Sequence, residues 1–347
     1  MKKRSALFAF VLTSAILLAG AAPASAQIVI KMGTVAPEGS PWHQALLEMQ
    51  QRWKDLSGGK VDLRIYAGGV AGDEPDMLRK MKIGQLHAAF MTCVKLQSVV
   101  PDVEAPSFPM MIQTDDELDY VIQKIRPILE KQLEEKEFMA LNWTSAGWVH
   151  FFAKEPVVTP EDMRKRKLFF WGSDITYIDL LKNSGFNPIP LAVTDLLPSL
   201  QTGLVDAFAS PSEAALAFQW YAVATHMTDL RWQPLLGVTV ITTRKWNEIP
   251  DDLKPKLLQA ANEIGVELAK KDRALETQAV SVMVEHGLKI HAVPEAAMKE
   301  WQTLVQDKGV PAFVGPRFSK EMYDRIQGIL AEYRAQPKSS EPAKAAP

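Results

Sequence analysis

The side chains that could carry out acid–base or metal chemistry are few, and their spacing favours structural roles. Asp73 and Glu74 are adjacent carboxylates that could act as a general acid and base, but two acids also suit the positive end of a helix dipole. His286 and His291 lie five residues apart, with no cysteine or carboxylate in metal-ligand spacing. Cys93 is the only cysteine, has no helper nearby in sequence, and is typical of a buried apolar thiol. We therefore expect no enzyme activity, no metal site and no cofactor.

Motifs of common enzyme classes are also missing from the sequence. It contains no P-loop, no nucleophile-elbow serine motif and no HExxH zinc motif. Gly68, Gly69 and Gly72 follow a predicted strand, but their spacing differs from that of a dinucleotide-binding loop, and we interpret them as a tight turn. Two alternatives stay open at this point, because a fold does not dictate a function. They are a secreted enzyme that uses acidic residues such as Glu38, and an interaction module whose cleft is vestigial.

The N-terminal region predicts export. A basic region at 2–4 precedes an apolar run, Ala6–Leu18, and small residues stand at 24–26. This order is typical of a secretory signal peptide, so we expect residues 1–26 to be removed by cleavage after Ala26 and the mature protein to lie in the periplasm. The apolar run is shorter than the ~20 residues that a membrane span needs.

The charge balance argues against nucleic acid as a partner. The chain has 39 Lys and Arg against 41 Asp and Glu, a formal net charge of −2. Three of the basic residues fall in the predicted signal peptide, so the mature protein is more acidic still, and it contains no basic block.

Strands and helices alternate along the first part of the chain. Apolar residues recur at helical spacing in Trp42–Leu56, where Ser40 is a plausible N-cap and Pro41 the first helical residue. Alternating strands and helices predict an α/β architecture with a largely parallel sheet. The predicted elements are strands at Gln27–Gly33, Val61–Tyr66 and Ala88–Thr92, and helices at Trp42–Leu56, Pro75–Ile83 and Asp115–Lys136.

The same pattern returns after two predicted strands, Phe138–Trp143 and Trp148–Ala153, which we interpret as the crossing into a second lobe. A strand at Gly237–Thr243 would bring the chain back, and the helical region Asp251–Glu285 is long enough to span both lobes. We therefore predict two lobes joined by crossing strands and a long helix. The predicted boundaries are 27–147 with 237–285 for lobe I, 148–236 with 286–334 for lobe II, and a disordered tail at 335–347.

Several stretches of the sequence form a set that is specific in its order and spacing. They are MGTVAPEGSPW at 32–42, SGGKV at 57–61, GDEPDM at 72–77, KEPVVTPEDM at 154–163 and LQTGLVD at 200–206. Together these stretches resemble the TRAP-type (tripartite ATP-independent periplasmic) solute-binding proteins over nearly the whole mature chain. The resemblance implies a two-lobed α/β periplasmic binding protein fold that closes on a small-molecule ligand, delivers it to TRAP membrane permease subunits and performs no catalysis.

The sequence departs from this family's pattern where the ligand's carboxylate is usually bound. Many members carry a strand ending in Lys-Ile-Arg-x-Pro, whose arginine holds the carboxylate through two parallel hydrogen bonds. Here Phe169 stands at the arginine position, Trp171 at the proline position, and Ser210 replaces a ligand-bonding asparagine. This resembles a subgroup that lacks the arginine and is associated with a tetratricopeptide-repeat periplasmic protein. It implies a ligand that is at least partly apolar.

The resemblance and the strand ends together nominate the ligand-binding residues. Phe169 and Trp171 come from the family's motif, although aromatic residues there could also pack in the lobe core. Binding residues of open α/β lobes gather where strands end, which adds residues from the first loops. The full set of predicted ligand-binding residues is Phe169, Trp171, Trp148, Ser210, Glu38, Trp42, Met91, Glu213 and Trp232.

Overall fold

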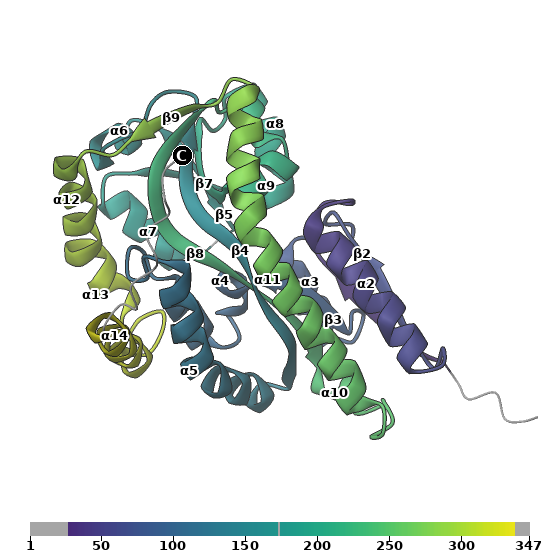
Figure 1. Ribbon diagram of the computed structural model, residues 1–347. Coiled ribbons are helices and arrows are strands. Elements are labelled where there is room, and N and C mark those ends of the chain that lie inside the picture. The colour runs from purple at the N-terminus through teal and green to yellow at the C-terminus, as the bar shows by residue number, and fades with distance from the viewer. Residues whose placement is uncertain (1–26, 173, 337–347) are drawn as a thin grey trace, which may run out of the picture.

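The computed structural model describes residues 27–172 and 174–336, which form two lobes connected by long elements (Figure 1). The connecting elements are two long strands, β4 (Phe138–Ala153) and β8 (His226–Thr242), and the 32-residue helix α11 (Lys254–Glu285) that runs beside them. Two lobes, crossing strands and a long helix agree with the architecture predicted from the sequence. The predicted signal peptide lies outside the described residues.

One mixed sheet runs through both lobes. Its strand order is β2-β1-β3-β8-β4-β7-β5-β6, and β9 pairs with β8. Within the lobes the pairing is parallel, as predicted, whereas β8 and β4 run antiparallel to each other and to their neighbours β3 and β7. The remaining strands are β1 (Ile28–Gly33), β2 (Val61–Tyr66), β3 (Ala88–Thr92), β5 (Lys167–Trp171), β6 (Asn187–Leu191), β7 (Ala207–Pro211) and β9 (Lys289–Ala292).

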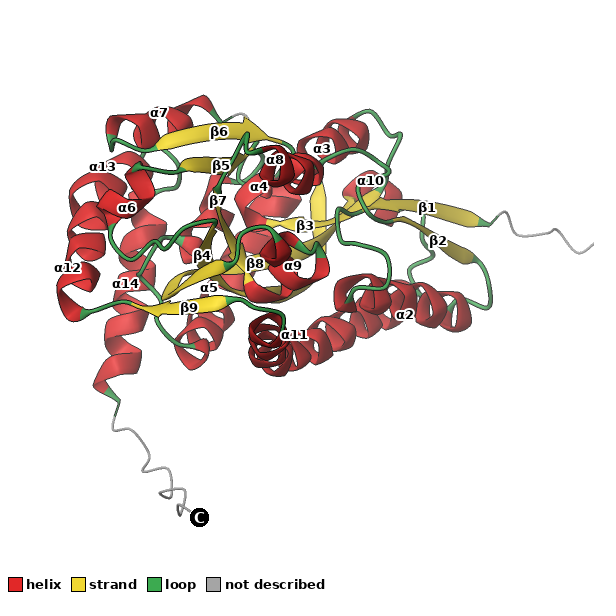
Figure 2. Ribbon diagram, turned by 90° about the horizontal axis from the view of Figure 1, so that it is seen from above, coloured by secondary structure: helices red, strands yellow, loops and turns green. Residues whose placement is uncertain are grey.

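Helices cover the sheet in each lobe, as the view from above shows (Figure 2). The first helix begins as the sequence predicts, because the Ser40 side chain accepts a hydrogen bond from the backbone N–H of His43 and Pro41 follows it. The helices are α2 (Pro41–Leu56), α3 (Glu74–Lys82), α4 (Cys93–Leu96), α5 (Asp115–Glu135), α6 (Pro160–Arg164), α7 (Ile175–Asn183), α8 (Leu196–Thr202), α9 (Ser212–Ala217), α10 (Thr243–Trp246), α12 (Glu295–Leu304), α13 (Val310–Phe313) and α14 (Lys320–Ala335).

The crossing strands are longer than the sequence pattern indicated. The two strands predicted at Phe138–Trp143 and Trp148–Ala153 are one strand, β4, and β8 begins at His226 rather than at Gly237. Register shifts in the β4–β8 pairing absorb the residues that interrupt the pattern, among them Gly147 with φ of 89° and Pro234 opposite Trp148. Bulges tolerate such residues within a continuous strand. The prediction of two separate strands for β4, and of a start at Gly237 for β8, was therefore wrong.

The long helix lies unusually close to β4. At Gly265 an added Cβ would lie 2.8 Å from the Asn142 Cβ and 3.1 Å from the Trp143 carbonyl oxygen. Asn142 also donates a 3.0 Å hydrogen bond from its side-chain amide to the Ala261 carbonyl of this helix. The absence of a side chain at 265 therefore permits α11 to pack directly on the crossing strand.

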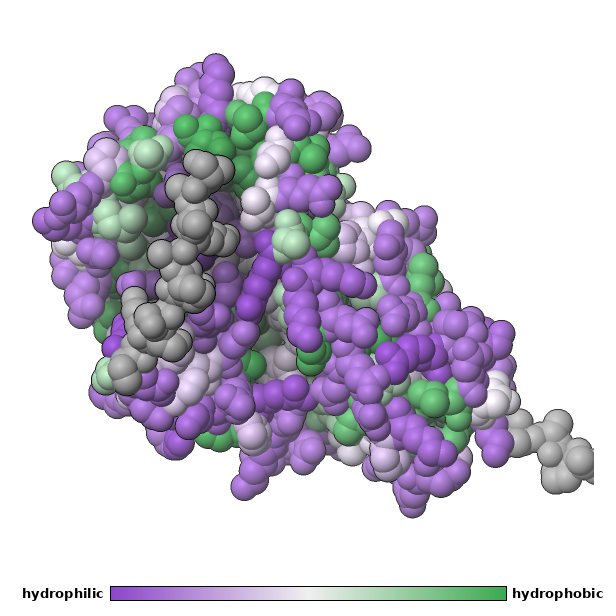
Figure 3. Space-filling view, viewed as in Figure 1, coloured by the Kyte–Doolittle hydropathy of each residue, from purple (hydrophilic) through white to green (hydrophobic). Residues whose placement is uncertain are grey.

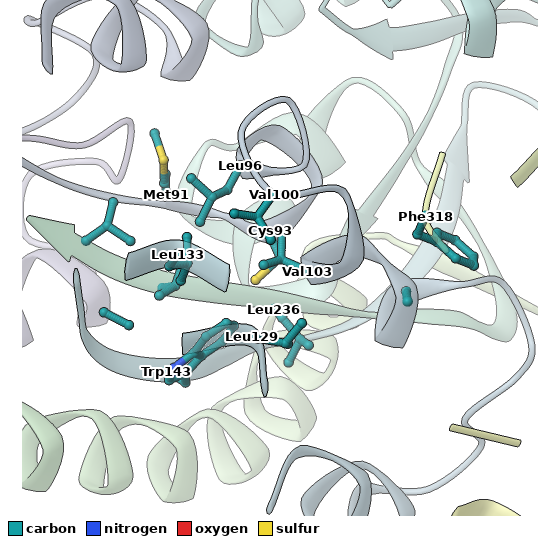
Figure 4. Close-up of a cluster of buried hydrophobic side chains, with 14 of the residues drawn as sticks. Met91, Cys93, Leu96, Val100, Val103, Leu129, Leu133, Trp143, Leu236 and Phe318 are labelled. Atoms are coloured by element: carbon teal, nitrogen blue, oxygen red, sulfur yellow. The ribbon is translucent and has the colours of Figure 1, made fainter. Parts of the chain in front are cut away.

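Apolar side chains form a core in each lobe. The largest cluster joins β3, α4, α5 and the crossing strands, and includes Met91, Cys93, Leu129 and Trp143 (Figure 4). Cys93 has no exposed surface, and burial raises the pKa of its thiol far above the ordinary range. The prediction of a buried apolar thiol is confirmed. The face seen in Figure 3 is mostly hydrophilic, with hydrophobic residues in smaller groups.

The C-terminal helix reaches across the predicted lobe boundary. Helix α14 packs against α5 and against the 3₁₀ helix at Pro101–Ser107, both of which fall in the range predicted for lobe I. It ends at Ala335, one residue into the predicted tail, and residues 337–347 of that tail lie outside the described residues. The exact lobe boundaries stay a prediction.

Candidate ligand-binding cleft

A cavity of about 510 Å³ lies between the lobes. Its walls come from the ends of parallel strands in both lobes, namely from residues that follow or end β1, β3, β5 and β7. The carboxyl ends of parallel strands meet at one edge of a sheet, which is where ligands of open α/β lobes bind. The volume falls within the range of pockets that hold small organic molecules, about 300–1,000 Å³.

Most of the wall is aromatic or aliphatic. Rings reach the cavity from both lobes and from the crossing strand β8, and a wall of this kind favours a ligand with apolar surface. The aromatic lining residues are Trp42, Phe90, Phe169, Phe170, Trp171, Tyr177, Phe218, Trp220 and Trp232.

Six of the nine residues predicted from the sequence line this cavity. Phe169 is only 8% exposed and belongs to the lobe core as well as to the cavity wall, so the two alternatives for it are not exclusive. The Ser210 hydroxyl lies at the wall, but it donates to the backbone carbonyl of Pro211 at 3.0 Å. The six are Phe169, Trp171, Ser210, Trp42, Met91 and Trp232.

Trp148 does not line the cavity. It is 1% exposed, its indole N–H donates to Asp115 at 3.0 Å, and the Arg231 guanidinium lies 5.2 Å from its ring. The β4 register shift between Ser145 and Trp148 explains the difference, because it interrupts the alternation of side chains and brings Val149 to the cavity instead.

Glu38 and Glu213 also lie away from the cavity wall. Glu38 is exposed on the turn before α2, where the chain leaves the strand end. Glu213 is 5% exposed and faces α11 near Asp272 and Glu276. Neither of its carboxyl oxygens has a hydrogen-bond partner among the described residues. Burial and the two neighbouring acids raise the pKa of Glu213 to about 9, and burial raises the pKa of Asp272 to about 8.

Four charged residues at the cavity were not nominated from the sequence: Glu74, Lys95, Asp174 and Arg317. Glu74 accepts hydrogen bonds from the backbone N–H of Thr92 at 2.9 Å and from its hydroxyl at 2.7 Å. Burial raises the pKa of Glu74 to about 8. Lys95 could have been predicted from the sequence, because it follows the end of the strand from which Met91 was predicted. Arg317 had no such signal, since it comes from a distant segment without a motif.

Arg317 is already neutralised by two carboxylates. It binds Glu104 through two hydrogen bonds of 3.0 and 2.9 Å and also pairs with Asp174, and its guanidinium lies 5.0 Å from the Tyr177 ring. Although burial acts in the opposite direction, these hydrogen bonds and charges hold the pKa of Asp174 below its usual value. This group joins segments far apart in the sequence at the edge of the cavity.

Trp171 connects the two lobes across the cavity. Its indole N–H, from β5, lies 2.9 and 3.1 Å from the two carboxylate oxygens of Asp73, and its backbone carbonyl accepts a hydrogen bond from the Lys95 ammonium. Asp73 also caps α3 by accepting from the Glu74 backbone N–H at 2.9 Å, so the prediction that the adjacent acids begin a helix is confirmed.

The profile of the family "Bacterial extracellular solute-binding protein, family 7" matches residues 32–308. The chain belongs to this family. The predicted solute-binding function and the two-lobed fold are thereby confirmed at the level of the family. Within the described residues, no helix combines the length and apolar character needed to cross a membrane.

Known proteins resemble the chain over most of its length at low identity. The C4-dicarboxylate-binding periplasmic protein DctP of Rhodobacter capsulatus is 24% identical, covering 96% of this chain and all of that protein. The sialic acid-binding periplasmic protein SiaP of Vibrio cholerae is 22% identical over 80% of this chain and 88% of its own length.

Solved structures share the fold. A TRAP periplasmic solute binding protein from Sulfurospirillum deleyianum with bound succinate has a TM-score of 0.79 and 23% identity, covering 88% of this chain and 99% of the other. The sugar acid binding protein DctPAm from Advenella mimigardefordensis, in complex with galactonate, has a TM-score of 0.81 and 19% identity over the same shares.

Proposed function

We propose that this chain is the periplasmic receptor of a TRAP transporter, and that it captures a small, partly apolar organic solute and delivers it to the membrane permease. The observation that carries the proposal is the aromatic cavity between the lobes, built from strand ends as in an open α/β binding site. The names of similar proteins support the transport role, since they describe periplasmic binding proteins.

An aromatic cavity can provide the binding free energy that the family's arginine supplies elsewhere. Burying ~100 Å² of apolar ligand surface at ~25 cal/mol per Å² contributes about 2.5 kcal/mol. A hydrogen bond to a charged group contributes a similar amount, about 1.5–3 kcal/mol. Phe169 lies at the arginine's position in the motif and at the cavity wall, which supports membership of the subgroup associated with a tetratricopeptide-repeat partner.

We also propose that the protein is not an enzyme and that its signal peptide is cleaved after Ala26. Among the described residues that line the cavity there is no histidine or cysteine to act as base or nucleophile. Glu74, a lining carboxyl, has both oxygens occupied by Thr92.

Native mass spectrometry of protein isolated gently from the periplasm tests the receptor proposal. We expect a small molecule to co-purify and to raise the melting temperature when added back, because a ligand that binds only the folded state adds RT ln(1 + [L]/Kd) to stability. A mature N-terminus at Gln27 in the same spectrum checks the cleavage site. If no molecule co-purifies and no compound of a metabolite library raises the melting temperature, the receptor proposal is wrong.

The substitution Phe169→Arg tests whether position 169 sets ligand chemistry. A guanidinium at the cavity wall should create measurable succinate binding in a folded variant and weaken the apolar ligand by about tenfold or more. Isothermal titration calorimetry measures both, with Phe169→Leu as the control that removes the ring without adding charge. An unchanged ligand preference in folded Phe169→Arg would place this side chain outside the ligand's reach.

A further inference from the structure

Lys95 is the cation at the cavity that is not paired with a carboxylate. It lies on α4, directly after the end of β3, and its ammonium lies 4.9 Å from the Trp171 ring and 5.7 Å from the Phe170 ring. In the described part of the chain, the Trp171 carbonyl is the one acceptor within hydrogen-bond distance of its nitrogen, and no carboxylate lies within 4.0 Å. An ammonium has three N–H donors, so a single carbonyl acceptor leaves two of them available for a ligand.

The acids around Lys95 are engaged elsewhere. Glu104 and Asp174 accept hydrogen bonds from Arg317, and Asp73 accepts one from the indole N–H of Trp171. Both oxygens of Glu74 are held by Thr92, and burial raises the pKa of Glu74 to about 8. The charged groups that face Lys95 from the elements packed against it are Asp73, Glu74, Glu104, Asp174 and, beyond these acids, Arg317.

We propose that Lys95 anchors the ligand: its ammonium binds the single carboxylate of an amphipathic monocarboxylate whose apolar body lies against the aromatic wall. This inference rests on the proposed receptor function. A partly buried charge is stabilised by a partner, and a hydrogen bond between two ions is about twice as strong as one between neutral groups. The anchor comes from lobe I, whereas Phe169, at the position of the family's arginine, is in lobe II.

The same charges exclude a second carboxylate on the ligand. Of the two cations that line the cavity in the described residues, Arg317 is already held by two acids, so a dicarboxylate would leave one charge against an apolar wall. Burying an unpaired carboxylate there is strongly unfavourable. The site should therefore prefer monocarboxylates, in contrast to the succinate found in the Sulfurospirillum protein.

Calorimetry with matched ligand pairs tests the inference. The probes are 3-phenylpropionate, indole-3-acetate and octanoate, each with its carboxamide, and succinate as the dicarboxylate. We expect the wild-type protein to bind at least one acid about tenfold or more tightly than its amide, and succinate not measurably. Lys95→Gln should weaken the acid about tenfold to a hundredfold and the amide by no more than about twofold.

Two further variants separate a role in binding from a role in folding. Lys95→Arg keeps the charge and should restore acid binding to within about tenfold of wild type. Lys131→Gln removes the charge of an exposed lysine on α5, away from the cavity, and should change nothing. Circular dichroism confirms that each variant is folded. If Lys95→Gln is folded and binds the acid as tightly as wild type, the inference is wrong.

The pH dependence of ligand affinity provides an independent test. As pH rises from 7 to 9, Glu74, whose pKa burial raises to about 8, ionises and competes with the ligand's carboxylate for Lys95. This change weakens acid binding, by about tenfold or more at pH 9, and leaves amide binding unchanged. Glu74→Gln cannot ionise and should therefore flatten the profile for the acid between pH 7 and 9. A flat profile for the acid in the wild-type protein overturns the inference.

The outcomes distinguish this inference from the receptor proposal. If a co-purified molecule is found but neither acids nor Lys95 variants behave as described, the monocarboxylate anchor fails and the receptor proposal stands. If no molecule co-purifies and none of the probes binds, both fail together.

Discussion

At the scale of single residues, Glu213 shows what a buried acid does to stability. Its carboxyl is buried against α11 beside Asp272 and Glu276, and burial together with these two acids raises its pKa to about 9. In the unfolded chain a glutamate titrates near 4.3. Between these values the unfolded state releases a proton that the folded state keeps, so stability falls as pH rises from about 4 through about 9.

We therefore expect Glu213→Gln to raise the melting temperature at pH 8 by several degrees and to have little effect at pH 4. The amide needs no proton and has nearly the same shape. Differential scanning calorimetry across this pH range measures the effect. The stability of the variant should decline with pH less steeply than that of the wild type but should not become flat, because the Asp272 pKa, raised to about 8, acts in the same direction. Equal slopes in the two proteins would show that Glu213 is ionised in the folded state.

Single residues also show how far the sequence could predict the site. Phe169 and Trp171 were found because a family motif fixes their position, and both lie at the cavity. Lys95 and Arg317 could not be ranked, since a lysine after a strand or an arginine in a late segment is ordinary until three-dimensional pairing shows which cation is neutralised. Pairing depends on contacts between residues far apart in sequence, which no local pattern records.

At the scale of elements, the packing of α11 on β4 depends on the missing side chain at Gly265. We expect Gly265→Ala to destabilise the protein by about 1–3 kcal/mol, because a methyl group would overlap the Asn142 Cβ and approach the Trp143 carbonyl. Chemical denaturation measures the loss. The control is Gly328→Ala on α14, where an added Cβ meets nothing within 4 Å and helix propensity should instead raise stability slightly.

The crossing strands mark the limit of pattern-based prediction for elements. Helix starts such as Ser40 with Pro41 follow local rules and were predicted correctly. The continuity of β4 and β8 through Gly147 and Pro234 depends on the opposite strand, which supplies hydrogen bonds on either side of each bulge. The bulge in β4 also turns the Trp148 side chain away from the cavity. The failure to predict the bulge therefore explains why Trp148 was wrongly expected to line the ligand site.

At the scale of the whole molecule, the contact of Trp171 with Asp73 joins the two lobes across the cavity. We expect Asp73→Asn, which keeps the cap of α3, to weaken ligand binding about tenfold and to increase the radius of gyration of the ligand-free protein. Small-angle X-ray scattering and calorimetry measure the two effects. Trp171→Phe, which keeps an aromatic ring but removes the indole donor of the same pair, should reproduce both. A compact, tightly binding Asp73→Asn variant would show that closure does not use this contact.

The single thiol of this protein makes such motions convenient to measure. Cys93 is fully enclosed in the cluster of Figure 4, and its raised pKa keeps it protonated and unreactive at neutral pH. Reagents that modify exposed thiolates should therefore leave the native chain unlabelled. A pair of cysteines introduced on opposite lobes could carry spin labels or fluorophores without removing Cys93, and the distance between the labels would report opening and closing directly.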